Sequence, residues 1–345
     1  MADCCCCRRS DGGGRTGASA ATATAAGRRS RACPALLIVA SAVAVALIAS
    51  LELSPAVAYR SRGWLRECAK WDAPARRFLV STFFGSGVAE IAVDGAAAPE
   101  EREVVAETDV AGNASVGIAV DRARRRLLVV FADVLGLRHG AVAAYDLESW
   151  ARHFLTRLSG PGDGDAFADD VAVDEEGTAY VTDAKANKIW KVGVDGELLS
   201  IIRNETFVQR KGWYHNLVGL NGIVYHPNGY LLVIHTSGGH LFKVNPRTEE
   251  VSLVKVEGSL RRGDGLELIS PTKLAIAGTP SRVAESSDDW ETAKVTGRYI
   301  GPMHRIATSA TVKDGKVYLN HIIGYGITKR THLIAEGIFS PLVVN

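Results

Sequence analysis

A sequence unit of about 50 residues recurs along most of this chain, and it constrains the fold more than any other feature. The unit is clearest at residues 169–183, DDVAVDEEGTAYVTD, where an acidic pair opens an alternating apolar strand, followed by a glycine turn and a second strand. Related runs begin at Asn221 and Asp264. Aligning the turns gives these equivalent first positions: Glu67, Val116, Asp169, Asn221, Asp264 and Ala307.

Successive first positions lie 43 to 53 residues apart, which leaves room for four short strands in each unit. Short strands punctuated by Gly and Pro at such a period are typical of a β-propeller. A helical repeat of this length would need amphipathic runs of 3.6-residue period, and the repeats contain none. The sequence therefore predicts an all-β fold, a six-bladed β-propeller over residues 60–345.

The residues before the repeats differ in composition. Residues 1–33 are rich in Ala, Gly, Ser, Arg and Cys without apolar periodicity, which predicts disorder. Residues 35–51 are uncharged and apolar and follow three arginines, so residues 34–58 are expected to form a hydrophobic helix. It would be a membrane signal anchor, or a secretory signal peptide cleaved after Ala56-Val57-Ala58. A plastid transit peptide is the alternative, because residues 8–33 contain a single acidic residue.

The distribution of charge excludes one class of partner. The formal net charge is +2, and six arginines lie in the first 31 residues, so the repeats are close to neutral. DNA and RNA binding need a basic face interleaved with aromatic residues, which the repeats lack. We therefore expect no nucleic-acid partner.

Oxygen-bearing side chains occupy four of the six first positions. In a propeller the first strand of each blade lines the central channel, so Glu67, Asp169, Asn221 and Asp264 are expected to meet at one mouth. Three carboxylates packed together repel one another, and a hard cation relieves that cost. Ligands that are all oxygen favour Ca²⁺ or Mg²⁺. Asp170 could support this metal site, and strand capping or turn formation is the structural alternative for each acid.

These residues resemble motifs of the senescence-marker-protein/gluconolactonase family, six-bladed propellers of the calcium-dependent phosphotriesterase superfamily. Residues 67–72, ECAKWD, keep the Glu, Trp and Asp of the family's Glu-Gly-Pro-x-Trp-Asp. Residues 169–174, DDVAVD, are similar to its Asn-Asp-x-x-x-Asp, while Asn221-Gly222 and Asp264-Gly265 resemble its Pro-Asn-Gly and Asp-Gly. The resemblance covers roughly residues 62–340. It implies a divalent metal at the four positions and hydrolysis of lactones or phosphotriesters.

Two departures from the family pattern concern the substrate. Sugar lactonases place an arginine two residues before the third-blade ligand, and this chain has Phe167 there. The catalytic histidine of related paraoxonases corresponds to Val116-Gly117. Neither substrate class therefore carries over to this chain.

The expected activity is hydrolysis of a small lactone-like or other ester substrate with a divalent metal as Lewis acid. Asp264 or Asp170 would take a proton from the attacking water. Phe167, His215 and His304 precede first strands and are expected to shape the substrate pocket. The alternatives are a non-catalytic propeller scaffold that binds a partner protein, and a strictosidine-synthase-like enzyme with an apolar pocket and no need for metal.

Overall fold

The structure, a computed structural model, describes residues 32–51, 56–93, 99–160, 162–301 and 305–342. The chain divides near residue 47 into two units, of which the first contains most of helix α1 (Ala32–Leu51). Within the described ranges, no helix qualifies as a membrane-spanning segment by length and hydropathy. The membrane segment expected at residues 35–51 is therefore not supported by the structure. The disorder expected for residues 1–33 lies outside the described residues except at Ala32 and Cys33, which begin α1 instead.

The second unit is built from strands, most of which pair antiparallel with their neighbours in sequence. The strands are β1 (Ala56–Ser61), β2 (Ala69–Asp72), β3 (Arg77–Ser81), β4 (Gly87–Ala92), β5 (Arg102–Ala106), β6 (Ala114–Asp121), β7 (Arg126–Ala132), β8 (Gly140–Asp146), β9 (Arg152–Ser159), β10 (Ala168–Val173), β11 (Ala179–Asp183), β12 (Lys188–Val192), β13 (Leu198–Arg203), β14 (Leu220–His226), β15 (Tyr230–His235), β16 (His240–Val244), β17 (Val251–Glu257), β18 (Gly263–Ser270), β19 (Lys273–Gly278), β20 (Ser281–Glu285), β21 (Thr292–Tyr299), β22 (Ala307–Lys313), β23 (Lys316–His321), β24 (Arg330–Glu336) and β25 (Ser340–Pro341). Two short 3₁₀ helices, η1 (Glu205–Phe207) and η2 (Trp213–His215), lie between β13 and β14.

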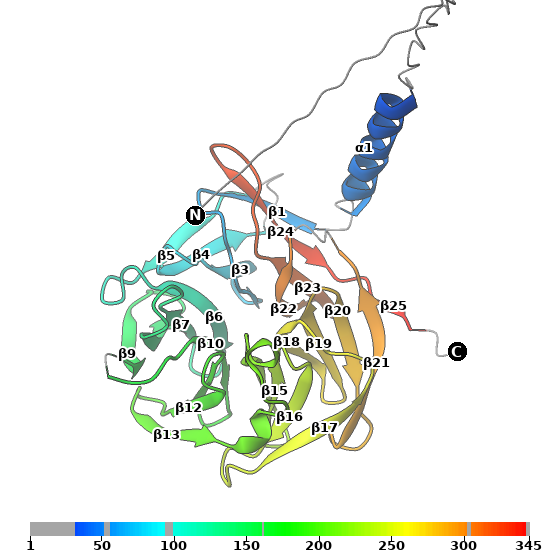
Figure 1. Ribbon diagram of the computed structural model, residues 1–345. Coiled ribbons are helices and arrows are strands. Elements are labelled where there is room, and N and C mark those ends of the chain that lie inside the picture. Colours follow the sequence, from blue (N-terminus) through cyan, green and yellow to red (C-terminus); the bar gives the residue numbers. More distant parts are fainter. Residues whose placement is uncertain (1–31, 52–55, 94–98, 161, 302–304, 343–345) are drawn as a thin grey trace, which may run out of the picture. The chain divides into compact units, whose positions relative to one another are not determined.

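The strands form four-stranded meanders, as in a β-propeller. Three sheets have the orders β2-β3-β4-β5, β6-β7-β8-β9 and β10-β11-β12-β13. The meanders β14-β15-β16-β17 and β18-β19-β20-β21 are joined by a short parallel pairing of β17 with β21, and β25 adds to β21. In Figure 1, β9, β13, β17 and β21 lie at the periphery, while β6, β10, β18 and β22 lie nearer the centre.

The last sheet joins the two ends of the described β-unit. Its order is β1-β24-β23-β22, and β1 pairs with β24 from Ala56 opposite Ala335 to Ser61 opposite Arg330. Ala56, Val57 and Ala58, which the sequence suggested as a cleavage site, are therefore part of a paired strand. The helix expected over residues 34–58 ends at Leu51 instead.

Middle strands are buried because neighbouring sheets cover both of their faces. β7, RLLVVFA, is buried along its whole length, which explains why its sequence is a continuous apolar run rather than an alternating one. Hydrophobic clusters fill the junctions between consecutive sheets. At the junction that closes the unit, Tyr59 of β1 and Ile334 of β24 pack with Trp71 and Phe78 of the first meander.

Two buried histidines each make a contribution to stability that is lost in mild acid. His332 donates from Nε2 to the Gly63 carbonyl oxygen (3.0 Å), and its buried Nδ1 has no hydrogen-bond partner. Burial lowers the pKa of His332, and of His235, to about 4. The unfolded chain therefore binds these protons at a higher pH than the folded chain, so the contribution of each histidine to stability falls as the pH drops from the unfolded pKa near 6.5 toward 4.

We expect each histidine to contribute about 2 kcal/mol less to the free energy of unfolding at about pH 5 than at about pH 7, while the buried carboxyls of Asp170 and Asp264, whose pKa values are raised, act in the opposite direction. Urea denaturation of the wild type and of His332→Gln at both pH values checks this. The variant should lose less stability between them. An equal loss in the two proteins would show that His332 does not carry the effect.

Candidate functional site

The same irregularity occurs near the start of four first strands. The ladder skips two residues between Ser115 and Ile118 in β6, Ala168 and Val171 in β10, Leu220 and Ile223 in β14, and Gly263 and Leu266 in β18. Such β-bulges bend a strand and re-aim its side chains. The first skipped residues are Val116, Asp169, Asn221 and Asp264, the positions that the repeat placed first.

In β22 the skipped residue is Thr308, between the pairs formed by Ala307 and Ser309. Thr308 therefore takes the last first position, and the alignment that placed Ala307 there is wrong by one residue. The equivalent positions were counted from the turn that follows each first strand, but the bulge, and not the turn, determines which residue is equivalent. The Thr308 hydroxyl donates to the Glu67 carbonyl oxygen. A fifth first position therefore has an oxygen-bearing side chain, which the repeat alignment missed.

Glycines bring neighbouring first strands into backbone contact at this level. A Cβ on Gly222 would lie 2.3 Å from the Asp264 carbonyl oxygen, and one on Gly265 would lie 2.7 Å from that of Thr308. Any larger residue would force the strands apart. The Asn-Gly and Asp-Gly pairs therefore hold Asn221, Asp264 and Thr308 near one another.

Four carboxylates and one amide form what we call the acidic ring: Glu67, Asp169, Asp170, Asn221 and Asp264. Burial raises the pKa of Glu67 and of Asp169 well above the usual range, and the charge of Asp264 raises both further. Burial and then the charge of Asp170 raise the pKa of Asp264. These carboxylates are close enough to oppose one another's ionisation.

Glu67 carries an unsatisfied atom within the acidic ring. Its Oε2 is buried and has no hydrogen-bond partner, whereas its backbone carbonyl accepts from Asn320 Nδ2 at 2.8 Å. Asn221 hydrogen-bonds to the Asp264 side chain, which favours the ionised carboxylate. Leaving a buried carboxylate oxygen without a partner is costly, and a cation would satisfy it.

The acidic ring is not a closed coordination shell. In the part of the chain that the structure describes, no three His, Cys, Asp or Glu side chains are arranged as a ready-made metal-binding group. The ring gathers the carboxylates in one electrostatic environment, and their side chains would have to converge further to share a cation.

Asp170 is held differently from the other acids. Its Oδ1 accepts from the Val171 N–H (2.9 Å) and its Oδ2 from the Ile223 N–H (3.3 Å). Burial raises its pKa to about 6, although the positive charge of Lys70 opposes the rise. Lys70 Nζ in turn lies 2.7 Å from Glu267 Oε2, and this ion pair lines a cavity of about 290 Å³ to which all of the first strands contribute.

The residues expected to bind substrate lie on connections that precede first strands. Phe167, just before β10, is half-buried against the core, and its N–H donates to Asp183 Oδ1 (3.0 Å). His215 ends η2, with its ring centroid 4.0 Å from that of Tyr214. The neighbouring Trp213 is 78% exposed. His304 lies outside the described residues.

Sequence comparisons identify no relative. No known family profile matches this chain, and no curated protein matches it.

Solved structures share the fold at low sequence identity. A protein assigned as a gluconolactonase matches with a TM-score of 0.54 and 16% identity, over 85% of this chain and 97% of that chain. A gluconolactonase from Xanthomonas campestris gives 0.51 and 17%, over 79% and 87%. An inactive virginiamycin B lyase variant from Staphylococcus aureus gives 0.53 and 10%, over 79% and 82%. These likenesses establish the propeller-type fold alone.

Proposed function

We propose that this chain is a six-bladed β-propeller hydrolase that cleaves a lactone-like or other ester bond with a divalent cation, Ca²⁺ or Mg²⁺, at one mouth of its channel. The observation that carries the proposal is the buried, unpartnered Oε2 of Glu67 in an electrostatic cluster with Asp169 and Asp264. Buried carboxylates with strongly perturbed pKa values are characteristic of functional sites.

The arrangement of the core supports six blades. The meanders β14–β17 and β18–β21 count as two blades, because only the outer strands β17 and β21 join them. Hydrophobic clusters lie between each pair of consecutive meanders, including the pair formed by the last sheet and the first. A closed ring of six junctions accounts for all of these clusters.

The side chains that would hold the cation are Glu67, Asp169, Asn221 and Asp264. All four offer oxygen, as Ca²⁺ and Mg²⁺ require. When bound, the cation would neutralise the clustered carboxylates and polarise the substrate carbonyl as a Lewis acid.

Asp264 is the better of the two candidate bases. Its carboxylate is only half-buried, so an oxygen that the cation does not use could accept a proton from the attacking water. The water oxygen then bonds to the carbonyl carbon, the ester C–O bond breaks, and the departing oxygen takes a proton to give an acid and an alcohol. Both oxygens of Asp170 are bound by backbone N–H groups, so Asp170 would hold the neighbouring strands and supply charge.

The side chains proposed to contact the substrate favour an ester that is not a sugar acid. Phe167 offers an aromatic ring where a sugar lactonase has arginine, and Trp213 and Tyr214 are exposed beside His215. We propose that Phe167, His215 and His304 contact the substrate. Lactones belong among the compounds to be tested, because two of the structural neighbours are described as gluconolactonases.

The activity is tested with a panel of simple lactones and aryl esters. Full-length protein should hydrolyse members of the panel with Ca²⁺ or Mg²⁺, lose the activity in a chelator, and regain it when the metal is restored. Absence of turnover with metal bound would favour a protein-binding scaffold. Turnover that a chelator does not change would favour a metal-independent, strictosidine-synthase-like enzyme.

A further inference from the structure

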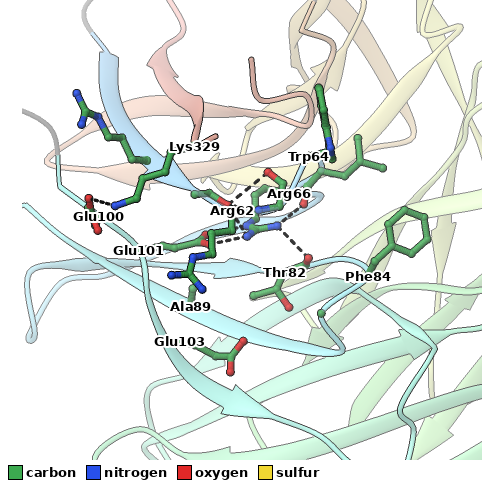
Figure 2. Close-up of a pocket in the computed structure, with 15 residues that line it drawn as sticks. Arg62, Trp64, Arg66, Thr82, Phe84, Ala89, Glu100, Glu101, Glu103 and Lys329 are labelled. Carbon is green, nitrogen blue, oxygen red and sulfur yellow. Dashed lines mark hydrogen bonds and ion pairs between the residues drawn. The ribbon is translucent and has the colours of Figure 1, made fainter. Parts of the chain in front are cut away.

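A cavity of about 510 Å³ lies outside the acidic ring, between the segment that follows β1 and the edge of the first meander. Figure 2 shows Arg62, Trp64, Phe84 and Lys329 around it. A second cavity of about 700 Å³ shares Arg60, Arg62 and Lys329 with the first. We call the two together the basic pocket.

Two cations of the basic pocket are already neutralised. The guanidinium of Arg66 makes a two-pronged ion pair with Glu101, at 2.9 and 2.7 Å, and also donates to the Thr82 carbonyl oxygen. Lys329 is paired with Glu100. These pairs, which appear as dashed lines in Figure 2, fix one wall of the pocket but leave little positive charge to offer.

Other cations of the basic pocket form no ion pair of their own, although Lys329, and then the nearby charges of Arg60 and Arg62, lower the pKa of Glu100. Within the described ranges, the guanidinium groups of Arg60 and Arg62 make neither a hydrogen bond nor an ion pair, and both side chains are exposed. Arg330 stacks over the Trp64 ring at 4.1 Å and donates to backbone carbonyls. The three guanidinium charges exceed the single remaining carboxylate, that of Glu103, so the pocket has a net charge of +2.

Aromatic side chains stand at the same pocket without being covered by the protein. Trp64 is 56% exposed and Phe84 is 61% exposed. Large apolar side chains gain from contact with an apolar or planar part of a ligand. The basic pocket thus offers a net positive charge, with two guanidinium groups outside any ion pair, beside exposed aromatic surface.

We propose that the basic pocket binds a phosphate monoester group, carried by a lipid headgroup or by a soluble ester. A phosphate monoester bears between one and two negative charges near neutral pH, which matches the two unpaired guanidiniums. The planar fork of an arginine matches the oxygens of phosphate in paired hydrogen bonds. Trp64 and Phe84 would contact the carbon skeleton of the ligand, and this site is independent of the proposed esterase chemistry.

The test compares two double variants of the full-length protein in a neutral detergent. Arg60→Ala/Arg62→Ala removes the proposed contacts, and Arg203→Ala/Arg247→Ala removes two exposed arginines elsewhere with the same change in charge. Glycerol 3-phosphate is titrated calorimetrically, and Trp emission reports whether Trp64 is perturbed. We expect roughly tenfold or greater loss of affinity in the first variant and none in the second.

Vesicles separate the two sources of the phosphate. Flotation with phosphatidylcholine vesicles, with and without phosphatidic acid, should show the same dependence on Arg60 and Arg62 if the ligand is a headgroup. Binding of either phosphate probe that needs this arginine pair supports the proposal. Equal loss in both double variants, no binding of either probe, or tighter binding of a simple carboxylate such as succinate would overturn it. Matching urea midpoints among the variants confirm that each is folded.

Discussion

Asp264→Asn is expected to weaken Ca²⁺ binding by roughly 100-fold or more, because the affinity of such sites depends on the number of charged ligands. The same substitution should stabilise the metal-free protein, since it removes one of several buried carboxylates that raise one another's pKa. With Ca²⁺ in excess the wild type should become more stable than the variant, because the wild type alone gains the full free energy of binding. Calorimetry and thermal unfolding with and without Ca²⁺ measure both effects.

Glu175→Gln is the matched control, since Glu175 is an exposed acid outside the acidic ring. It should leave the affinity and both stabilities unchanged. If Asp264→Asn binds Ca²⁺ as tightly as the wild type, the acidic ring is not a metal site. If the metal-free variant is less stable than the metal-free wild type, the carboxylates do not repel as proposed, and a structural role for Asp264 is indicated.

Arg66→Ala is expected to lower the free energy of unfolding by about 3–5 kcal/mol, as breaking a buried ion pair usually does. Arg66 is 4% exposed, and besides Glu101 it contacts Ser61 Oγ and the carbonyl oxygens of Leu65 and Thr82. Removing it leaves a partly buried carboxylate without its counter-charge and several acceptors without a donor. Chemical denaturation measures the loss.

Arg102→Ala provides the comparison for Arg66→Ala, because Arg102 also pairs with a glutamate but its side chain is 67% exposed. Its effect should stay within about 1 kcal/mol. Arg66→Lys should fall between the two, since lysine keeps the charge but not the planar fork. Similar losses for Arg66→Ala and Arg102→Ala would mean that the buried network contributes no more than a surface pair.

The repeat could be read from the sequence because its determinants are local. Each repeat combines alternating apolar residues with a turn glycine within a few positions. Two repeats also carry a bulge pair that contains glycine, Asn221-Gly222 and Asp264-Gly265. The prediction of strand meanders with equivalent first positions follows from these short patterns. The one-residue error at Thr308 arose in β22, where the ladder skips one residue rather than the two that it skips in β6, β10, β14 and β18.

Features that join distant segments left no such pattern. The pairing of β1 with β24 links residues more than 250 positions apart, and Ala56–Ser61 follows an apolar helix closely enough to resemble the end of a signal sequence. The basic pocket draws Arg60, Phe84 and Lys329 from three separate segments. Periodicity does not report such neighbours, so only the fold could reveal them.

The partnership of β1 and β24 also sets an order of events during synthesis. β1 leaves the ribosome long before β24, so the closing sheet cannot form until the intervening meanders have been synthesised. The intervening meanders have local partners and can fold as they appear. Until then β1 has only its bridge between Arg60 and Glu100, and a nascent chain that stalls before residue 330 would expose the edge that β24 covers to chaperones or to another copy of the same strand.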